Sequence, residues 1–229
     1  MTNDVTMGAE AGEVRFADFE RSARVLYPLE KGEASDDNGR GAVNWGITEY
    51  FLNLVNDKRK PSELSWDDAK ELYRRYYWEP WKLGKIHEVR QALADFIFAS
   101  LINTSPQHVV LNVQKALNGN GFNLRQDGMI GPVTLHALNT CDVPLFVWNF
   151  YHFMHGWYEQ LADNSRYVLN PKTGDHEITK PNAKFLGGWI NRLKYLHKFS
   201  GEINPPSFVP DLSLYAPLYA PTDPRKKYR

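Results

Sequence analysis

The segment 29–48 carries residue types suited to acid catalysis. Glu30 directly follows an apolar helical pattern, and Asp36 and Asp37 come six and seven residues later, across a glycine-rich turn. A carboxyl group held at a helix end can donate a proton, and a second carboxylate across a cleft can orient a water. Cleavage of a glycosidic bond with inversion uses such a pair, about 6.5–9.5 Å apart. An acidic surface loop has the same spacing, so both interpretations stay open.

Neighbouring residues offer a competing acid and substrate contacts. Glu33 is the competing acid. Trp45 can line a sugar subsite, because aromatic faces stack on the apolar faces of sugar rings, or it can pack in the core. Asn44 beside it can contact substrate or hydrogen-bond the turn itself.

These residues require elements that position them. An apolar helical pattern precedes the acid, and Pro28 is expected to end that helix. Residues 33–45 have no periodic pattern and predict turns or a short hairpin, after which Thr48 can cap a helix to about Asn56. The apolar positions of the first helix are Phe16, Phe19, Ala23, Leu26 and Tyr27.

The rest of the chain predicts further helices and almost no strand, so the fold class is all-α, with about eight helices. Ser65 to Asp68 resembles a capping box, and a polar loop is expected from the end of the seventh helix to Asn182. The predicted helices lie at about 65–76, 86–103, 106–117, 132–138, 143–161 and 185–199.

Composition excludes several classes of function. The 229 residues include 27 basic and 27 acidic side chains, so a general electrostatic attraction to nucleic acid or an anionic membrane is not supported. Seven Trp, 12 Tyr and 12 Phe suit carbohydrate binding as well as a core. We find no apolar run of membrane-spanning length and no classical signal peptide in residues 1–20, so no membrane insertion is expected.

Other motifs carry little chemistry. His152 and His155 share a helix face but lack the context of a zinc hydrolase, and the single cysteine, Cys141, is interpreted as a packing residue. Asp127 and Gly128 are interpreted as turn-formers. No phosphate-binding or dinucleotide-binding motif is present. We therefore expect neither a metal nor an organic cofactor.

Several motifs together resemble the glycoside hydrolase 108 family, the lysozyme-like muramidases of phage lysis cassettes and bacterial secretion loci. The motifs are Glu30-x-Gly32, the Asp/Gly turn, Gly41-x-x-Asn44-x-Gly46-Ile47-Thr48, Tyr73 with Tyr77-Trp78, and Asn103 eleven residues before Gln114. The stretches 113–117 and 127–135 are similar to the peptidoglycan-binding half usually attached to this family. The resemblance covers about residues 16–195.

The resemblance implies a lysozyme-like fold that hydrolyses the β-1,4 bond between N-acetylmuramic acid and N-acetylglucosamine. Glu30 would be the catalytic acid, and Asp37 or Asp36 would orient a water or stabilise the oxocarbenium charge. The expected substrate contacts are Asn44, Trp45, Thr48 and Asn103. The expected partner is the glycan strand of peptidoglycan, bound by a monomer.

Three positions depart from the family pattern. Lys31 replaces a glycine, Val43 replaces a threonine whose hydroxyl helps to hold the attacking water, and Ala99 replaces an aspartate. Asp95, one turn earlier than Ala99, is a candidate replacement. The residue that would bind the attacking water is therefore not identified. Two alternatives stay open: a lytic transglycosylase on the same fold, and a non-catalytic peptidoglycan-binding module.

The expected organisation has four segments: a polar arm at 1–14, a lysozyme-like catalytic part at 15–105, a helical peptidoglycan-binding part at 106–200 and a Pro-rich extended tail at 201–229. Without a signal peptide, we expect synthesis in the cytoplasm. Action in the periplasm or cell wall would follow release through a holin or a secretion system.

Overall fold

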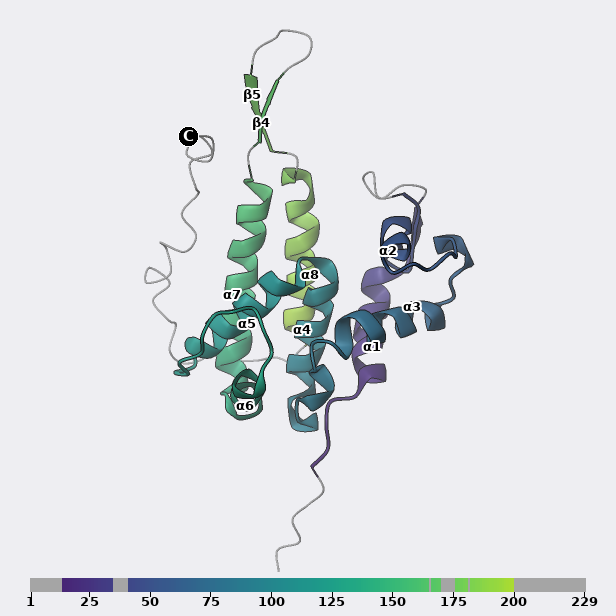
Figure 1. Ribbon diagram of the computed structural model, residues 1–229. Helices are drawn as coiled ribbons and strands as arrows, with labels where there is room; N and C mark the ends of the chain where they lie inside the picture. The colour runs from purple at the N-terminus through teal and green to yellow at the C-terminus, as the bar shows by residue number, and fades with distance from the viewer. Residues whose placement is uncertain (1–13, 35–40, 165, 170–175, 181, 200–229) are drawn as a thin grey trace, which may run out of the picture.

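The computed structural model describes residues 14–34, 41–164, 166–169, 176–180 and 182–199. Within these ranges the chain forms eight α-helices and two small antiparallel sheets (Figure 1). The helices are α1 (Phe19–Glu30), α2 (Glu49–Leu54), α3 (Trp66–Tyr73), α4 (Gln91–Asn103), α5 (Pro106–Asn118), α6 (Pro132–Thr140), α7 (Val143–Ala162) and α8 (Leu186–Phe199). The sheets are β1 (Glu33–Ala34), β2 (Val43–Asn44) and β3 (Ile47–Thr48), and the hairpin of β4 (Arg166–Leu169) and β5 (His176–Thr179). The predicted mainly helical fold is confirmed.

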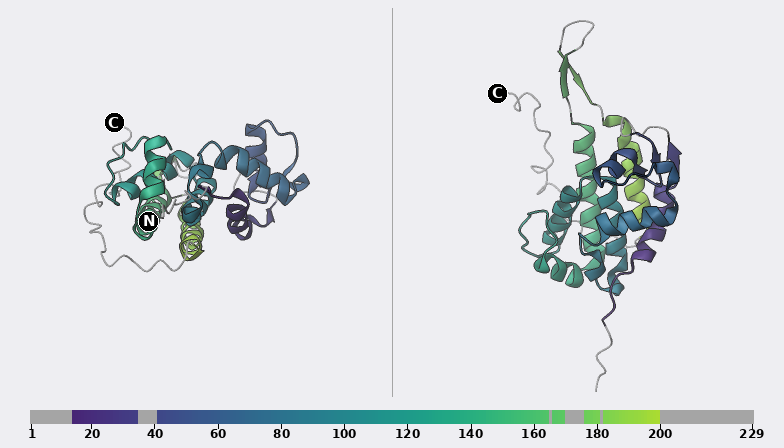
Figure 2. Two further views of the ribbon diagram at one scale, coloured as in Figure 1. Left: turned by 90° about the horizontal axis from the view of Figure 1, so that it is seen from below. Right: turned by 45° about the vertical axis from the view of Figure 1, so that its right-hand side comes forward.

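The helices are arranged around α4. Helix α1 packs on one side of α4, α5 packs on another, and α8 contacts both α4 and α7. Figures 1 and 2 show α7 and α8 side by side, with the β4–β5 hairpin projecting beyond their ends. The N-terminal helices and the C-terminal helices therefore meet at α4 and α8.

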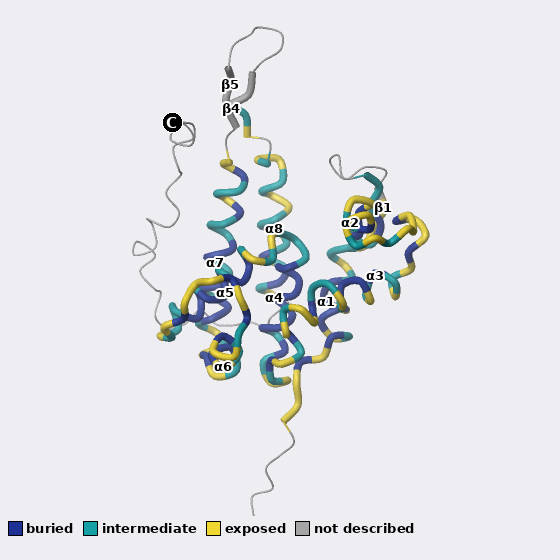
Figure 3. Tube along the Cα trace, in the orientation of Figure 1, coloured by how far each residue is buried: buried dark blue, intermediate teal, exposed yellow. Residues whose placement is uncertain are grey.

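Helix α4 is buried because its sequence is mainly apolar, and its buried polar side chains Gln91, Asp95 and Ser100 are hydrogen-bonded. Only Ala92, Ile102 and Asn103 of its thirteen residues are not buried. One continuous hydrophobic core runs from Leu26 of α1 through Phe96 of α4 to Phe150 of α7 (Figure 3). Within the described ranges, no helix combines the length and the apolar character needed to cross a membrane.

Helix α1 extends further than predicted. Pro28 lies inside it, and the helix ends at Glu30. The expectation that Pro28 ends the helix is therefore wrong. A proline in the last turn removes only its own N–H, and the Lys31 N–H still donates to the Tyr27 carbonyl at 3.0 Å. The extra residues place Glu30 on the last turn of a rigid element.

Two helix boundaries also differ from the prediction. The α-helix that begins at Trp66, capped by Ser65 and Asp68, ends at Tyr73 and continues as a π-helical turn, Arg74–Trp78. Helix α4 starts at Gln91 instead of residue 86, because the N–H groups of His87 and Glu88 donate to the Asn139 side chain and the Arg15 carbonyl. These bonds draw the backbone into 3₁₀ turns before α4.

The β4–β5 hairpin was not expected from the sequence. Arg166 to Leu169 pairs antiparallel with His176 to Thr179 in the segment predicted to be a polar loop. Each strand has only four residues, too few for a clear period-two pattern. The hairpin connects α7 to α8.

Asp95 lies between α1 and α4 and does not line the pocket described below. Its Oδ1 accepts hydrogen bonds from Ser22 Oγ at 2.6 Å and from Gln91 Nε2 at 2.7 Å. Burial raises the pKa of this carboxyl, and the two hydrogen bonds partly oppose the rise. Asp95 thus joins α1 to α4, away from Glu30.

This pKa shift predicts a pH-dependent effect of Asp95→Asn. Because the pKa is raised in the folded protein, ionisation of Asp95 costs the folded state free energy, and stability falls as pH rises from the unfolded pKa through the folded one. The amide keeps the Oδ1 acceptor without the charge. We expect the melting temperature of Asp95→Asn to exceed that of the wild type at pH 7, and to exceed it by less at pH 4. Calorimetry at both pH values, with the exposed Glu71→Gln as control, measures this. A pH-independent difference would contradict it.

Candidate active site

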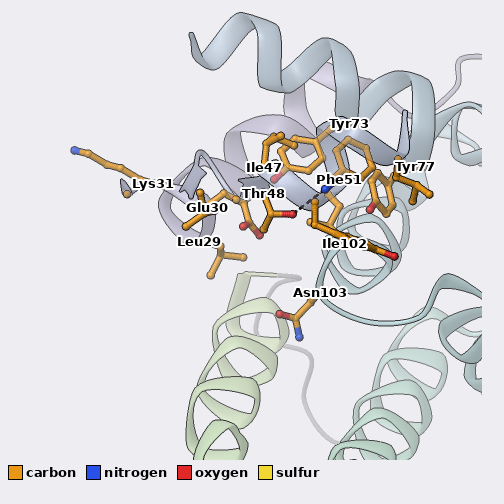
Figure 4. Close-up of a pocket in the computed structure, with 15 residues that line it drawn as sticks. Leu29, Glu30, Lys31, Ile47, Thr48, Phe51, Tyr73, Tyr77, Ile102 and Asn103 are labelled. Carbon is orange, nitrogen blue, oxygen red and sulfur yellow. Dashed lines mark hydrogen bonds between the residues drawn. The ribbon is translucent and has the colours of Figure 1, made fainter. Parts of the chain in front are cut away.

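A pocket of about 810 Å³ opens where the end of α1 meets the β2–β3 hairpin and the end of α4 (Figure 4). Glu30 and Thr48 point into it, Asn103 lies opposite them, and the aromatic rings of Phe51, Tyr73 and Tyr77 line one side. The remaining wall residues are Leu29, Lys31, Gly32, Val43, Gly46, Ile47, Tyr50, Leu54 and Ile102. The pocket therefore combines one carboxyl group with aromatic and apolar surface, the composition of a sugar-binding cleft.

Glu30 is held by an arginine from the opposite end of the chain. Arg192 of α8 donates from Nη2 to Glu30 Oε1 at 2.5 Å and to the Ala99 carbonyl at 3.1 Å. The two side chains are only 12% and 10% exposed, so water screens this ion pair weakly. Sequence reasoning did not identify Arg192, because nothing in a helical pattern connects residues 162 positions apart.

The turn of the β2–β3 hairpin packs closely against the Glu30 carboxylate. Trp45 and Gly46, its two central residues, have φ angles of 52° and 71°, as a type I′ turn requires. A Cβ atom on Gly46 would overlap Glu30 Oε2 and lie 2.5 Å from the Tyr73 hydroxyl oxygen. Only glycine fits here, which accounts for the glycine of the Asn-x-Gly pattern.

Tyr73 fixes this turn from the other side. Its hydroxyl donates to the Trp45 carbonyl at 2.8 Å. Burial, reinforced by the Glu30 charge, raises the pKa of Tyr73 well above 10, so the phenol remains a neutral donor. The position of Glu30 is therefore set by Arg192, Gly46 and Tyr73 together.

Thr48 and Val43 form one edge of the pocket. They are paired across β2 and β3, and both line the wall. The Thr48 Oγ1 accepts from the Phe51 N–H at 3.1 Å and so caps α2 (Figure 4). Val43 presents methyl groups to the pocket, at the position where the family resemblance implies a threonine hydroxyl.

Asn103 connects the pocket to the C-terminal helices. It is the last residue of α4, and its Nδ2 donates to the Tyr158 hydroxyl of α7 at 2.7 Å. Tyr158 in turn stacks on Trp189 of α8, with ring centroids 5.3 Å apart. The far wall is thus held by α7 and α8.

Two further predicted residues, Asn44 and Trp45, do not line the wall. The buried Asn44 donates to the carbonyls of Pro61 and Leu64, and Trp45 Nε1 donates to the Leu64 carbonyl while its ring packs near Tyr27 and Trp66. Their contacts shape the hairpin, and their role in substrate binding stays a prediction. Asp36 and Asp37 lie outside the described residues.

Two exposed pocket residues were not predicted from the sequence. Tyr50 and Leu54 of α2 are 61% and 70% exposed and line the pocket. They lie one helical turn apart and present an aromatic ring and an aliphatic side chain at its rim. The sequence of α2 is apolar at four of its six positions, so nothing in it separates these two exposed side chains from core residues such as Leu52.

The mainly helical fold and this pocket, with one largely buried carboxyl group beside aromatic side chains, are consistent with a lysozyme-like glycosidase. Residues 28–104 match the glycosyl hydrolase 108 family, and residues 108–194 match a family described as a predicted peptidoglycan domain. The chain therefore combines a segment that matches the glycosyl hydrolase 108 family with a peptidoglycan-binding domain C-terminal to it. It is a peptidoglycan hydrolase with muramidase-type activity.

Comparison of solved structures gives the same fold. The chain resembles the structure of SagA from Brucella abortus, with a TM-score of 0.60 and 18% sequence identity. The alignment covers 80% of this chain and 92% of the other. No curated protein matches the sequence.

Proposed function

We propose that the protein hydrolyses the β-1,4 bond between N-acetylmuramic acid and N-acetylglucosamine, with Glu30 as the general acid. The observation that carries this proposal is the placement of Glu30 on the wall of a sugar-sized pocket, at the end of α1 and fixed by three other elements. Fixed geometry favours proton transfer to a single oxygen of the bound glycan.

The proposed step is a protonation coupled to bond cleavage. Glu30 gives its proton to the glycosidic oxygen, the bond from that oxygen to C1 of N-acetylmuramic acid breaks, and a water adds to C1 and loses a proton. Asp37 or Asp36 is proposed to orient the water or to stabilise the positive charge at C1. Residues 106–200 are proposed to hold the glycan strand.

One observation favours a second candidate, the lytic transglycosylase. Val43 faces the pocket, and the hydroxyl of its partner Thr48 already caps α2. With no threonine hydroxyl at position 43 to hold the water, attack on C1 by the 6-hydroxyl of N-acetylmuramic acid competes with hydrolysis.

Product analysis in ¹⁸O-labelled water distinguishes the candidates. Digestion of purified peptidoglycan by the hydrolase leaves reducing N-acetylmuramic acid ends carrying one ¹⁸O atom. The transglycosylase leaves 1,6-anhydro ends with no label. We expect labelled ends, detected by mass spectrometry of the released muropeptides. Only anhydro ends would overturn hydrolysis, and binding without new ends would indicate a non-catalytic module.

We propose that the protein acts as a monomer in the periplasm or cell wall, where its substrate lies. Passage through a holin pore or a secretion system would bring it there, in phage lysis or in bacterial secretion. Size-exclusion chromatography and fractionation of producing cells test the two parts of this proposal.

A further inference from the structure

The strongest unassigned feature is the arginine that the peptidoglycan-binding half places against Glu30, beside the hydrolase pocket. The family match to the hydrolase ends at residue 104, and Arg192 lies in the second match. Its Nη2 nevertheless lies 2.5 Å from Glu30 Oε1. The catalytic carboxylate is therefore completed by a residue outside the hydrolase domain.

The position of Arg192 is fixed by the packing of α8. Leu193 and Leu196 are 1% and 2% exposed and anchor the helix in the shared core. Trp189 stacks on Tyr158, and the Arg192 Nη2 also donates to the Ala99 carbonyl of α4. The guanidinium of Arg192 is therefore held in place by these contacts. The Glu30 side chain must adopt the orientation in which its Oε1 accepts the hydrogen bond from Arg192.

The charges at this site explain why an arginine is needed. Glu30 occupies the C-terminal end of α1, where the unpaired carbonyl groups carry partial negative charge. A general acid gains negative charge there as its proton leaves. A guanidinium in a poorly hydrated site stabilises that charge more than it would in water.

We propose that Arg192 is a positioning residue for Glu30, which orients the carboxyl group toward the pocket and compensates the charge that develops on it during proton transfer. This inference rests on the proposed role of Glu30 as the acid. The two halves accordingly form one composite active site, and the hydrolase half alone lacks the partner of its acid.

The test compares Arg192→Met with Arg192→Lys in the full chain. We expect the methionine variant to lower kcat at least roughly tenfold, with KM within about twofold of the wild type, because no substrate contact is lost. A lysine should restore most of kcat, since a single Nη atom contacts Glu30 and an ammonium can take its place. Lys194→Met removes an exposed charge from the same helix and serves as the matched control.

The outcomes separate this inference from the proposed function. A wild-type kcat in Arg192→Met, or an equal loss in folded Arg192→Lys, would overturn the positioning role while leaving the hydrolase intact. Absence of cleavage by the wild type itself would overturn the proposed function. Arg192→Met can be unstable because it leaves the Glu30 carboxylate unpaired. In that case the double variant Arg192→Met/Glu30→Gln should be more stable than Arg192→Met, because the unpaired carboxylate is removed. No gain in the double variant would contradict the coupling.

Discussion

Glu30→Gln is expected to lower the rate of peptidoglycan cleavage roughly 10²–10⁴-fold, the usual contribution of a general acid. Glutamine has nearly the same shape but no proton of suitable acidity. Its Oε1 can still accept the Arg192 hydrogen bond, so the pocket should keep its geometry. Turbidity clearing of purified cell walls, followed over time with both proteins, measures the effect.

The competing acid supplies the matched control. Glu33 is exposed on β1 and does not line the pocket, so Glu33→Gln should clear walls at the wild-type rate. Binding of walls by Glu30→Gln, measured by sedimentation, should be unchanged. Equal clearing by Glu30→Gln and the wild type would remove Glu30 from the mechanism.

Gly46→Ala is expected to have the second largest effect, on both activity and stability. The added Cβ would overlap Glu30 Oε2 and approach Tyr73, which forces the carboxylate away from Arg192. Displacement of a catalytic group by about 1 Å can cost roughly 100-fold in rate. The φ angle of 71° adds about 1–2 kcal/mol of backbone strain for a residue with a side chain.

Gly121→Ala separates the effect of backbone strain from the effect of displacing Glu30. Gly121 also has a positive φ, 92°, but a Cβ there would meet nothing within 4 Å. Its alanine variant should lose stability by a similar strain and keep the wild-type kcat. Melting temperatures and kcat for both variants give the comparison. A Gly46→Ala protein with wild-type kcat would show that the turn does not position the acid.

The sequence predicts those parts of the site that depend on local chemistry. Glu30 follows an amphipathic helix, and the Trp45-Gly46 turn lies where the glycine-rich segment indicated a hairpin. Thr48 caps α2 as expected, through its bond to Phe51. Each of these features is decided within a few residues, by capping, turn geometry or helical periodicity.

Features that depend on tertiary packing were not predictable in this way. Arginine on an amphipathic helix is normally a solvated residue, and only the docking of α8 against α4 turns Arg192 inward. The same applies to Asp95, whose buried partners Ser22 and Gln91 lie away from the pocket.

The burial of α4 has a consequence for how the molecule can be divided. Its apolar surface contacts α1 on one side and α5 and α8 on the other, so separating the halves would expose it to water. The two family segments should then melt in one cooperative transition instead of two. Exchange of wall-binding segments between such enzymes would succeed only if the α4-facing side chains are exchanged with them.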